Sequence, residues 1–327
     1  MRIHCLGGGL VGSYVTRRLV EADLEVHLFD VVERNTSAIF HLADAFSADH
    51  SAADIIVNML PGSLGNRMTE SLKDTGQRIV DLSFSEITPD RLSDVKSSIL
   101  WDVGIAPGLS NMLVAKAFRE FENLDEVSIK VGGNPQQPDG EWSYMAPFSP
   151  HDVIAEYTRP ARVIEQGKQI QVNAISDLHQ IDANGREMDA FLTDGLRSLL
   201  AMPAKKMGEY TVRWPGHIQK YQKTELNPDE LVEAWKMDYT RPEFTWMEVF
   251  VKSGNHTKRW VIEDLGSNGD SSMARTTGLV TACCVIAWLD RPKMFESGVY
   301  APEDLPDDVI ELVIEVMRSE GVSIVLQ

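Results

Sequence analysis

The sequence predicts an α/β protein, with an N-terminal doubly wound parallel sheet and an inserted α+β domain. Three observations support this fold class: a glycine-rich turn near the N-terminus, strand and helix patterns that alternate to about residue 102, and period-two strand patterns from residue 125 onward. We therefore expect a first domain of residues 1–122 completed by 273–327, and a second domain of residues 123–272.

The glycine-rich turn follows a short apolar run at residues 2–6 and precedes a helix pattern from Ser13 to about Ala22. Its spacing fits G-x-G-x-x-G, the pattern of a Rossmann dinucleotide site. The first glycine allows a tight turn, the second lets the backbone approach the pyrophosphate, and the third lets the helix pack on the sheet. The helix N-terminus adds N–H groups for the phosphates. The residues expected to contact a dinucleotide here are Gly7, Gly9, Leu10, Val11 and Gly12.

An acidic residue ends the second strand pattern, which runs from Leu24 to Phe29. This residue, Asp30, lies 18 positions after Gly12. A carboxylate at this place accepts the ribose hydroxyls of NAD and repels the 2′-phosphate of NADP, so NAD is the expected cofactor. The alternative is a glycine-rich turn that binds no ligand.

Polar residues also follow the next strand patterns, at 54–60, 76–82 and 97–102. Ligands of doubly wound sheets lie beyond the carboxyl ends of the strands, so we expect these residues to border the cofactor. Turn capping is the alternative for Asn58, Asp81 and Asp102. The residues concerned are Asn58, Leu60, Asp81, Ser83, Asp102, Val103 and Gly104.

Composition limits the classes of partner. The net charge is −18, which repels phosphate backbones and argues against nucleic-acid binding. No run approaches the roughly 20 apolar residues of a membrane span, and the longest candidate, 278–289, fits a buried helix. The three cysteines have neither disulfide nor metal-ligand spacing, and no histidine cluster suggests a metal site. The first strand starts at once and leaves no room for a signal peptide, so a cytoplasmic protein is expected.

The second domain begins with alternation at 126–131, typical of a half-exposed antiparallel strand. Ser149, Pro150 and Asp152 have the spacing of a helix start, with serine at the N-cap position. Further strand patterns occur at 169–175, 210–214, 245–251 and 258–264. Helix patterns at 278–289 and 306–318 and a last strand at 321–326 are expected to return to the first domain.

Seven motifs, taken together and in order, resemble those of the saccharopine dehydrogenase family, and within it those of the lysine 6-dehydrogenases. Each motif is weak alone, but their succession along the chain is specific. They are Asp102-x-Gly104-x-Ala106-Pro107-Gly108, Val131-Gly-Gly-x-Pro135, Phe148-Ser149, Tyr157-Thr-x-Pro160, Arg213-x-x-Gly216-His217, Met273-Ala-Arg-Thr-Thr277 and Gly298-Val-Tyr-x-Pro-Glu303.

The resemblance implies a Rossmann domain, an α+β substrate domain, a homo-oligomer such as a dimer, and NAD-linked oxidative deamination of the ε-amine of L-lysine. The chain departs from the family pattern in being shorter around 31–53 and 222–243. It also has Asp194-Gly195 where lysine 6-dehydrogenases tend to carry a glycine pair, and Pro215 where the family often has arginine. These departures bear on the identity of the amine more than on the chemistry.

Such a reaction needs a general base tuned near neutrality, because the amine must lose its proton before hydride leaves. We expect His217 in this role, with a partly buried or surface histidine as the alternative. Asp102 is a second candidate, to orient the nicotinamide amide or the substrate amine. For the substrate carboxylate, the candidates are Arg213, Arg275 and the helix start at Ser149; salt bridges are the alternative for the arginines. Trp142 and Tyr144 are candidates to wall an aliphatic chain, although strand aromatics are more often core.

The leading hypothesis is therefore an NAD-dependent amino-acid dehydrogenase acting on a C–N bond. An opine-type reductase, which joins an aldehyde to an amine as saccharopine or carboxynorspermidine enzymes do, is the alternative within enzymes. A non-catalytic NAD-binding protein is the alternative of another class.

Overall fold

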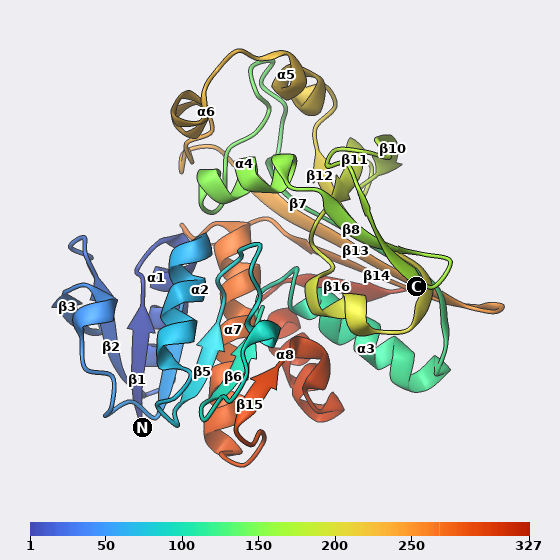
Figure 1. Ribbon diagram of the computed structural model, residues 1–327. Coiled ribbons are helices and arrows are strands. Elements are labelled where there is room, and N and C mark those ends of the chain that lie inside the picture. The colour runs from blue at the N-terminus through green and yellow to red at the C-terminus, as the bar shows by residue number, and fades with distance from the viewer. Residues whose placement is uncertain (268) are drawn as a thin grey trace. The chain divides into compact units, whose positions relative to one another are not determined.

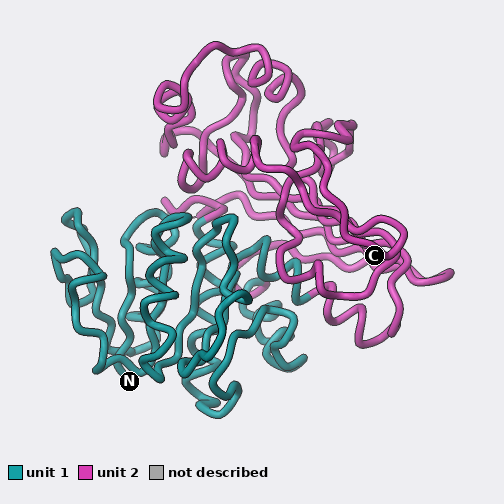
Figure 2. The backbone as a smooth tube through the Cα atoms, in the orientation of Figure 1, with its two compact units in different colours: residues 1–112, 274–317 teal, residues 113–273, 318–327 magenta. Residues whose placement is uncertain are grey.

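The structure is a computed structural model that describes residues 1–267 and 269–327. The chain divides into two compact units, shown in different colours in Figure 2. Unit 1 comprises residues 1–112 and 274–317, and unit 2 comprises residues 113–273 and 318–327. The fold class is confirmed: one parallel sheet with helices on its faces, and a second, mixed sheet.

Unit 1 contains a seven-stranded sheet in the order β15-β6-β5-β4-β1-β2-β3, with every neighbouring pair parallel. The order reverses direction between β1 and β4, which is where doubly wound sheets bind their ligands. The strands are β1 (Arg2–Leu6), β2 (Glu25–Asp30), β3 (Ile39–Leu42), β4 (Ile55–Asn58), β5 (Arg78–Asp81), β6 (Ser98–Trp101) and β15 (Gly298–Tyr300).

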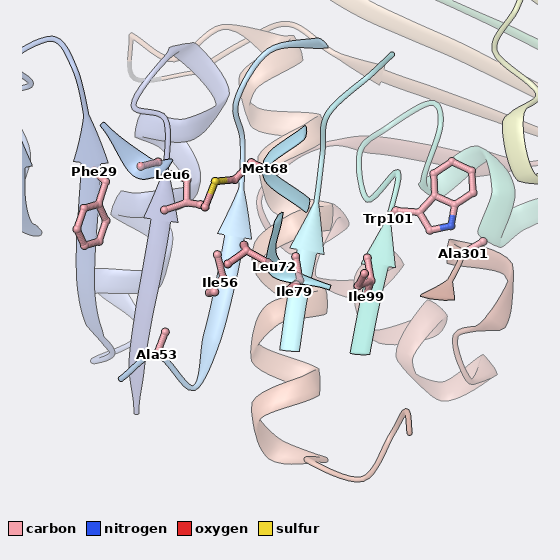
Figure 3. Packing of buried hydrophobic residues seen from close by; sticks show 11 residues of the cluster. Leu6, Phe29, Ala53, Ile56, Met68, Leu72, Ile79, Ile99, Trp101 and Ala301 are labelled. Carbon is pink, nitrogen blue, oxygen red and sulfur yellow. The ribbon is translucent and has the colours of Figure 1, made fainter. Parts of the chain in front are cut away.

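The central strands of unit 1 are buried on both faces, which explains their continuous β-branched sequence. On one face Met68 and Leu72 of helix α2 (Gly62–Leu72) pack against Leu6, Ile56 and Ile79 (Figure 3). On the other face lie α1 (Leu10–Glu21) and α7 (Ser272–Asp290), which approach each other closely because Gly278 has no side chain. A Cβ at Gly278 would lie 2.5 Å from the ring of Tyr14.

Helix α7 is long and apolar enough to satisfy a membrane-span test by length and composition alone. In the described structure, however, 89% of that stretch is buried inside the protein, as in the core helix of a globular domain. Unit 1 also contains most of α8 (Asp307–Ser319) and the short turns η1 (Ala45–Ser47), η2 (Pro89–Arg91) and η4 (Pro302–Asp304). Helix α3 (Leu109–Phe121) begins in unit 1 and continues in unit 2.

The shortened segment between β3 and β4 forms only the single turn η1, so no long helix covers the outer strands on that side. Four of the eight histidines gather there instead, around Phe29: His4, His27, His41 and His50. Nδ1 of His4 lies 3.0 Å from Nδ1 of His50, and His27 pairs with His41 at 2.9 Å. Burial, followed by the charges of neighbouring imidazoles, lowers the pKa of His4 to about 4. His4 is therefore neutral at pH 7 and packs as a hydrogen-bonded core residue.

Unit 2 contains a mixed sheet in the order β10-β11-β12-β7-β13-β14-β16, with the β8–β9 hairpin branching from β12. Figure 1 labels the seven strands of this order and β8. Its strands are β7 (Leu124–Pro135), β8 (Ala161–Glu165), β9 (Lys168–Val172), β10 (His179–Asp182), β11 (Glu187–Thr193), β12 (Ala204–Arg213), β13 (Glu243–Ser253), β14 (His256–Asp264) and β16 (Ser323–Leu326). The shorter elements are α4 (Pro150–Thr158), α5 (His217–Lys223), α6 (Pro228–Ala234) and η3 (Arg197–Ala201).

Alternation along β12 gives the two faces of this sheet different characters. Tyr210 and Val212 belong to an apolar cluster with Trp246 on one face. Glu209, Thr211 and Arg213 point to the opposite side, where α4, α5 and α6 contribute an aromatic cluster. The candidate groups of unit 2 therefore lie on one face of the sheet.

Three expectations about elements were wrong in whole or in part. The first helix begins at Leu10 rather than Ser13, because the glycine turn leads directly into it. The strand expected at 126–131 alternates in burial and is antiparallel to β13, as predicted, but β7 runs through the middle of its sheet and is also parallel to β12. The last strand does not return to the first sheet: β16 pairs with β14 in unit 2, as Ile324 opposite Ile262 shows.

Candidate active site

The glycine turn has the geometry that each glycine was expected to provide. Gly7 has φ +92°, and its N–H donates to the carbonyl oxygen of Phe29 at 2.9 Å. A Cβ at Gly12 would lie 2.1 Å from the carbonyl oxygen of Gly7, so only glycine fits there. A Cβ at Gly9 would meet nothing within 4 Å among the described residues. The backbone at Gly9 is thus open to a ligand, whereas Gly12 is closed by packing.

Helix α1 begins at Leu10, directly after this turn, with Gly9 at the N-cap position. The N–H of Ser13 already donates to the Gly9 carbonyl at 2.8 Å, which leaves the N–H groups of the first turn without intrahelical acceptors. The N–H groups of Leu10 and Val11 and the positive end of the helix dipole are suited to a phosphate.

Asp30 ends β2 beside this turn and is 8% exposed. One carboxylate oxygen accepts from the Gly8 N–H at 2.7 Å and from Nε of Arg34 at 2.9 Å, and the other accepts from the Val32 N–H at 2.9 Å. Burial alone would raise the pKa of Asp30, but these hydrogen bonds together outweigh burial and lower it. The carboxylate is therefore ionised at neutral pH, and it already accepts three hydrogen bonds from within the protein.

Asn58 and Asp81 do lie at adjacent strand ends, yet their hydrogen bonds run into the protein. The Asn58 amide donates to the carbonyl oxygen of Gly65 at 2.7 Å, and Thr69 Oγ1 donates to Asp81 at 2.7 Å. Asp81 also accepts from the N–H of Ser83 at 2.7 Å. Burial raises the pKa of Asp81 to about 6. These are the bonds of capping residues, which hold the loops after β4 and β5 in place; the Leu60 N–H is held in this way by Asn58 at 3.3 Å.

The segment after β6 forms a tight loop that depends on Gly108. A Cβ at Gly108 would lie 1.8 Å from the carbonyl oxygen of Gly104. Thr281 of α7 donates to the carbonyl oxygen of Val103 at 2.7 Å, and Thr277 packs against Gly104. Asp102 has φ +59° and is 3% exposed. The loop and the start of α7, which carries the buried Arg275, are thus brought together within unit 1.

In unit 2, Arg213 and His217 lie at the ends of one directed chain of hydrogen bonds through Tyr157. Nε of Arg213 donates to the Tyr157 hydroxyl at 2.7 Å, and that hydroxyl lies 3.1 Å from Nε2 of His217. Nδ1 of His217 lies 3.0 Å from the carbonyl oxygen of Trp142, which can only accept. His217 therefore carries its proton on Nδ1, and Tyr157 donates to Nε2.

This geometry contradicts the expectation that His217 is a base tuned near neutrality. The ring is 2% exposed among Trp142, Tyr144 and Trp235, and both of its nitrogens are engaged within the protein. Burial, then the positive charge of Arg213, lowers the pKa of His217 to about 3. A neutral imidazole with this pKa accepts a proton poorly at pH 7 and acts here as a hydrogen-bond partner.

Arg213 is likewise buried, and its hydrogen bonds are made within the protein. It is 3% exposed, donates to the carbonyl oxygen of Val212 at 2.9 Å and to the Tyr144 hydroxyl at 3.4 Å, and stacks 4.4 Å from the Tyr144 ring. Trp142 and Tyr144 belong to the buried aromatic cluster around it. Ser149 accepts from the N–H of Asp152 at 3.4 Å, so the predicted N-cap is confirmed. Arg213, Trp142 and Tyr144 thus build the interior of this face.

A second polar chain, which the sequence analysis missed, joins two carboxyl groups through two threonines. Glu209 accepts from Thr193 at 2.6 Å, the hydroxyls of Thr193 and Thr211 lie 2.8 Å apart, and Glu156 accepts from Thr211 at 3.0 Å. Burial, then the charge of Glu156, raises the pKa of Glu209 to about 8, and burial also raises the pKa of Glu156. A group that exchanges a proton near neutral pH is therefore present in unit 2, but it is a glutamate, Glu209.

Comparison with known proteins identifies the family. A model of the saccharopine dehydrogenase C-terminal domain matches residues 104–322, more than half of the chain. The chain belongs to the saccharopine dehydrogenase family. The fold is similar to that of apo saccharopine dehydrogenase (L-Glu forming) from Saccharomyces cerevisiae, with a TM-score of 0.73 and 13% identity over 100% of this chain and 99% of that chain. At this identity the likeness concerns the fold alone.

More distant similarity extends to other dehydrogenases. An engineered D-amino acid dehydrogenase matches with a TM-score of 0.47 and 12% identity, over 95% of this chain and 96% of that chain. DAP dehydrogenase from C. glutamicum, in complex with DAP, matches with a TM-score of 0.44 and 10% identity, over 98% and 99% of the two chains. These two matches are too distant to add to the family assignment.

The sequence predicted the glycine turn and the acid at the end of β2, but it did not predict several residues that hydrogen-bond to the candidate site residues. Tyr157 stands in a motif that carried the resemblance, which was the available signal for it. Arg34, Glu156, Glu209 and Thr193 had no such signal, because their partners are far away in sequence or lie in an irregular segment. Across the described ranges 1–267 and 269–327, no set of three or more metal-ligating side chains converges.

We predict opposite behaviour for two alanine substitutions in the turn. Gly12→Ala should lower the free energy of unfolding by about 1–3 kcal/mol, because its Cβ overlaps the Gly7 carbonyl. Gly9→Ala should leave stability nearly unchanged and weaken NADH binding, because its methyl group enters open space where the pyrophosphate approaches. Urea unfolding and NADH fluorescence titration measure the two effects. A Gly9→Ala protein with unchanged NADH affinity would contradict the assignment.

A pH dependence of stability follows from Glu209. Its pKa is raised from 4.5 to about 8 on folding, so between these values the folded state holds a proton that the unfolded state has released. This contribution is fully present below pH 4.5 and is lost as the pH rises through about 8. Glu209→Gln should therefore remove a negative slope of up to about 1.4 kcal/mol per pH unit. Urea unfolding from pH 5 to 9 compares the two proteins, and parallel curves would contradict the shift.

Proposed function

We propose that the protein is an NAD-dependent dehydrogenase that oxidatively deaminates an amino acid at a C–N bond, with the ε-amine of L-lysine as the substrate group. The observation that carries this proposal is the turn at Gly7, Gly9 and Gly12 beside the ionised Asp30, in a chain of the saccharopine dehydrogenase family. The seven family motifs along the chain support the choice of lysine.

Unit 1 offers the cofactor site. The open backbone at Gly9 and the first turn of α1 fit a pyrophosphate, and the ionised Asp30 fits the adenosine ribose. A bound nicotinamide supplies the acceptor for the hydride that leaves the carbon bearing the amine. Asn58 and Asp81 hold the neighbouring loops through their capping bonds, and Asp102 and Gly104 stand at the end of β6.

Unit 2 offers the groups that handle protons and position the substrate. The amine must be neutral before hydride leaves, so a carboxylate that is able to accept its proton near neutral pH is required. We place this role on Glu156, which is half-buried, has a raised pKa, and connects through Thr211 and Thr193 to Glu209. Arg213, Tyr157 and His217 form the rigid support of the same sheet face, and the charge of Arg213 favours an ionised Glu156.

Two other functions compete with this one. An opine-type enzyme of the same family would join an aldehyde to an amine and would run on the same nicotinamide chemistry. A non-catalytic NAD-binding protein would share only the cofactor site. The shortened segments at 31–53 and 222–243 motivate this last alternative.

The direct test is NADH formation by the purified protein with separate amino acids, polyamines and opines at alkaline pH. We expect turnover with L-lysine and much less with ornithine, because a shorter chain places the amine carbon differently. Turnover only with an opine would establish the alternative enzyme. Tight NADH binding without turnover of any amine would support the dinucleotide site but contradict the proposed deamination.

A pair of substitutions separates the two candidate proton acceptors. Glu156→Gln should lower kcat at least tenfold and abolish the acidic limb of the kcat pH profile, since the amide cannot take a proton. His217→Asn should lower stability through loss of the Tyr157 bond but keep the shape of the pH profile, because the imidazole does not titrate near neutrality. The opposite pattern, in which only His217→Asn changes the pH profile, would restore the histidine as the base.

A further inference from the structure

Arg34 lies in the irregular segment after β2 and packs directly over the glycine turn. Its Cγ would be 3.0 Å from a Cβ at Gly8, and its Nε donates to Asp30 at 2.9 Å. Only Nε is used in this bond. Within residues 1–267 and 269–327, the structure records no hydrogen bond from the two terminal nitrogens of Arg34. The Arg34 side chain as a whole is 35% exposed, so a ligand can reach it.

The charges around the adenosine ribose position are therefore balanced. Asp30 contributes a negative charge that would repel a 2′-phosphate, but the Arg34 guanidinium, 2.9 Å away, offsets it. Three donors already occupy the Asp30 oxygens, namely the N–H groups of Gly8 and Val32 and Nε of Arg34. The carboxylate retains room for a ribose hydroxyl, while the guanidinium retains a two-nitrogen fork of the kind that binds phosphate.

We propose that Arg34 is the residue that determines cofactor specificity, and that it lets the protein accept NADP as well as NAD by binding the 2′-phosphate with its terminal nitrogens. This inference rests on the proposed dinucleotide site and deepens it. The acid alone predicts exclusion of NADP, whereas the acid paired with Arg34 does not. Because the chain has a net charge of −18, a nearby positive charge is also needed for a doubly charged phosphate to bind favourably here.

The experiment is a fluorescence titration of NADH and NADPH with the full chain and with Arg34→Ala, Arg34→Lys and Arg2→Ala. Competition with adenosine 2′,5′-bisphosphate and with AMP isolates the 2′-phosphate. Arg2 is a matched control, since its removal changes the net charge equally at the start of β1, where it pairs with Glu25. Because binding is measured, the result does not depend on which amine the protein turns over.

We expect the wild-type protein to bind both cofactors, and Arg34→Ala to weaken NADPH and adenosine 2′,5′-bisphosphate at least tenfold while changing NADH and AMP less than threefold. Arg34→Lys should restore part of the NADPH affinity, more so at low salt, and Arg2→Ala should change neither cofactor. Equal losses for NADH and NADPH, or an unchanged ratio, would overturn the inference while the proposed function stands. Absence of binding by either dinucleotide would overturn both.

Discussion

The site in unit 1 depends on the contact between the Gly7 carbonyl and Gly12, where an added Cβ would lie at only 2.1 Å. It allows α1 to begin within three residues of β1 and to pack flat on the parallel sheet. From this follow the open backbone at Gly9, the free N–H groups of the first helical turn, and the bond from the Gly8 N–H to Asp30. The proposed cofactor site is thus a consequence of one packing requirement, and its polar groups are already held by hydrogen bonds within the protein.

Unit 2 solves a different problem, because it keeps a full positive charge in its interior. The guanidinium of Arg213 donates hydrogen bonds to Tyr157, Tyr144 and a backbone carbonyl. Its positive charge interacts favourably with the ionised forms of Glu156 and Glu209. A buried charge persists only when it is fully hydrogen-bonded and compensated. Burial and the charge of Arg213 both lower the pKa of His217, whereas for Glu156 and Glu209 the same charge opposes the burial that raises their pKa values.

The parts of this account that the sequence predicted rest on local signals. The glycine spacing, the acid at the end of β2, the buried strand patterns and the cap at Ser149 each depend on residues within a few positions of one another. The pKa of His217 could not be predicted, because it depends on Tyr157, Trp142 and Arg213, which other elements bring to it. The partner of Asp30 was missed because Arg34 lies in an irregular segment without periodicity. β16 was misplaced because its alternating sequence fits the edge of either sheet equally well.

The measurement that tests the central claim most directly is a crystal structure of the protein grown with NADH. The account predicts a pyrophosphate against the backbone of Gly9 and the first turn of α1, with the adenosine ribose hydrogen-bonded to Asp30. A dinucleotide found elsewhere, or a ribose that makes no contact with Asp30, would contradict it. In that case the glycine turn would serve only to pack α1 on the sheet.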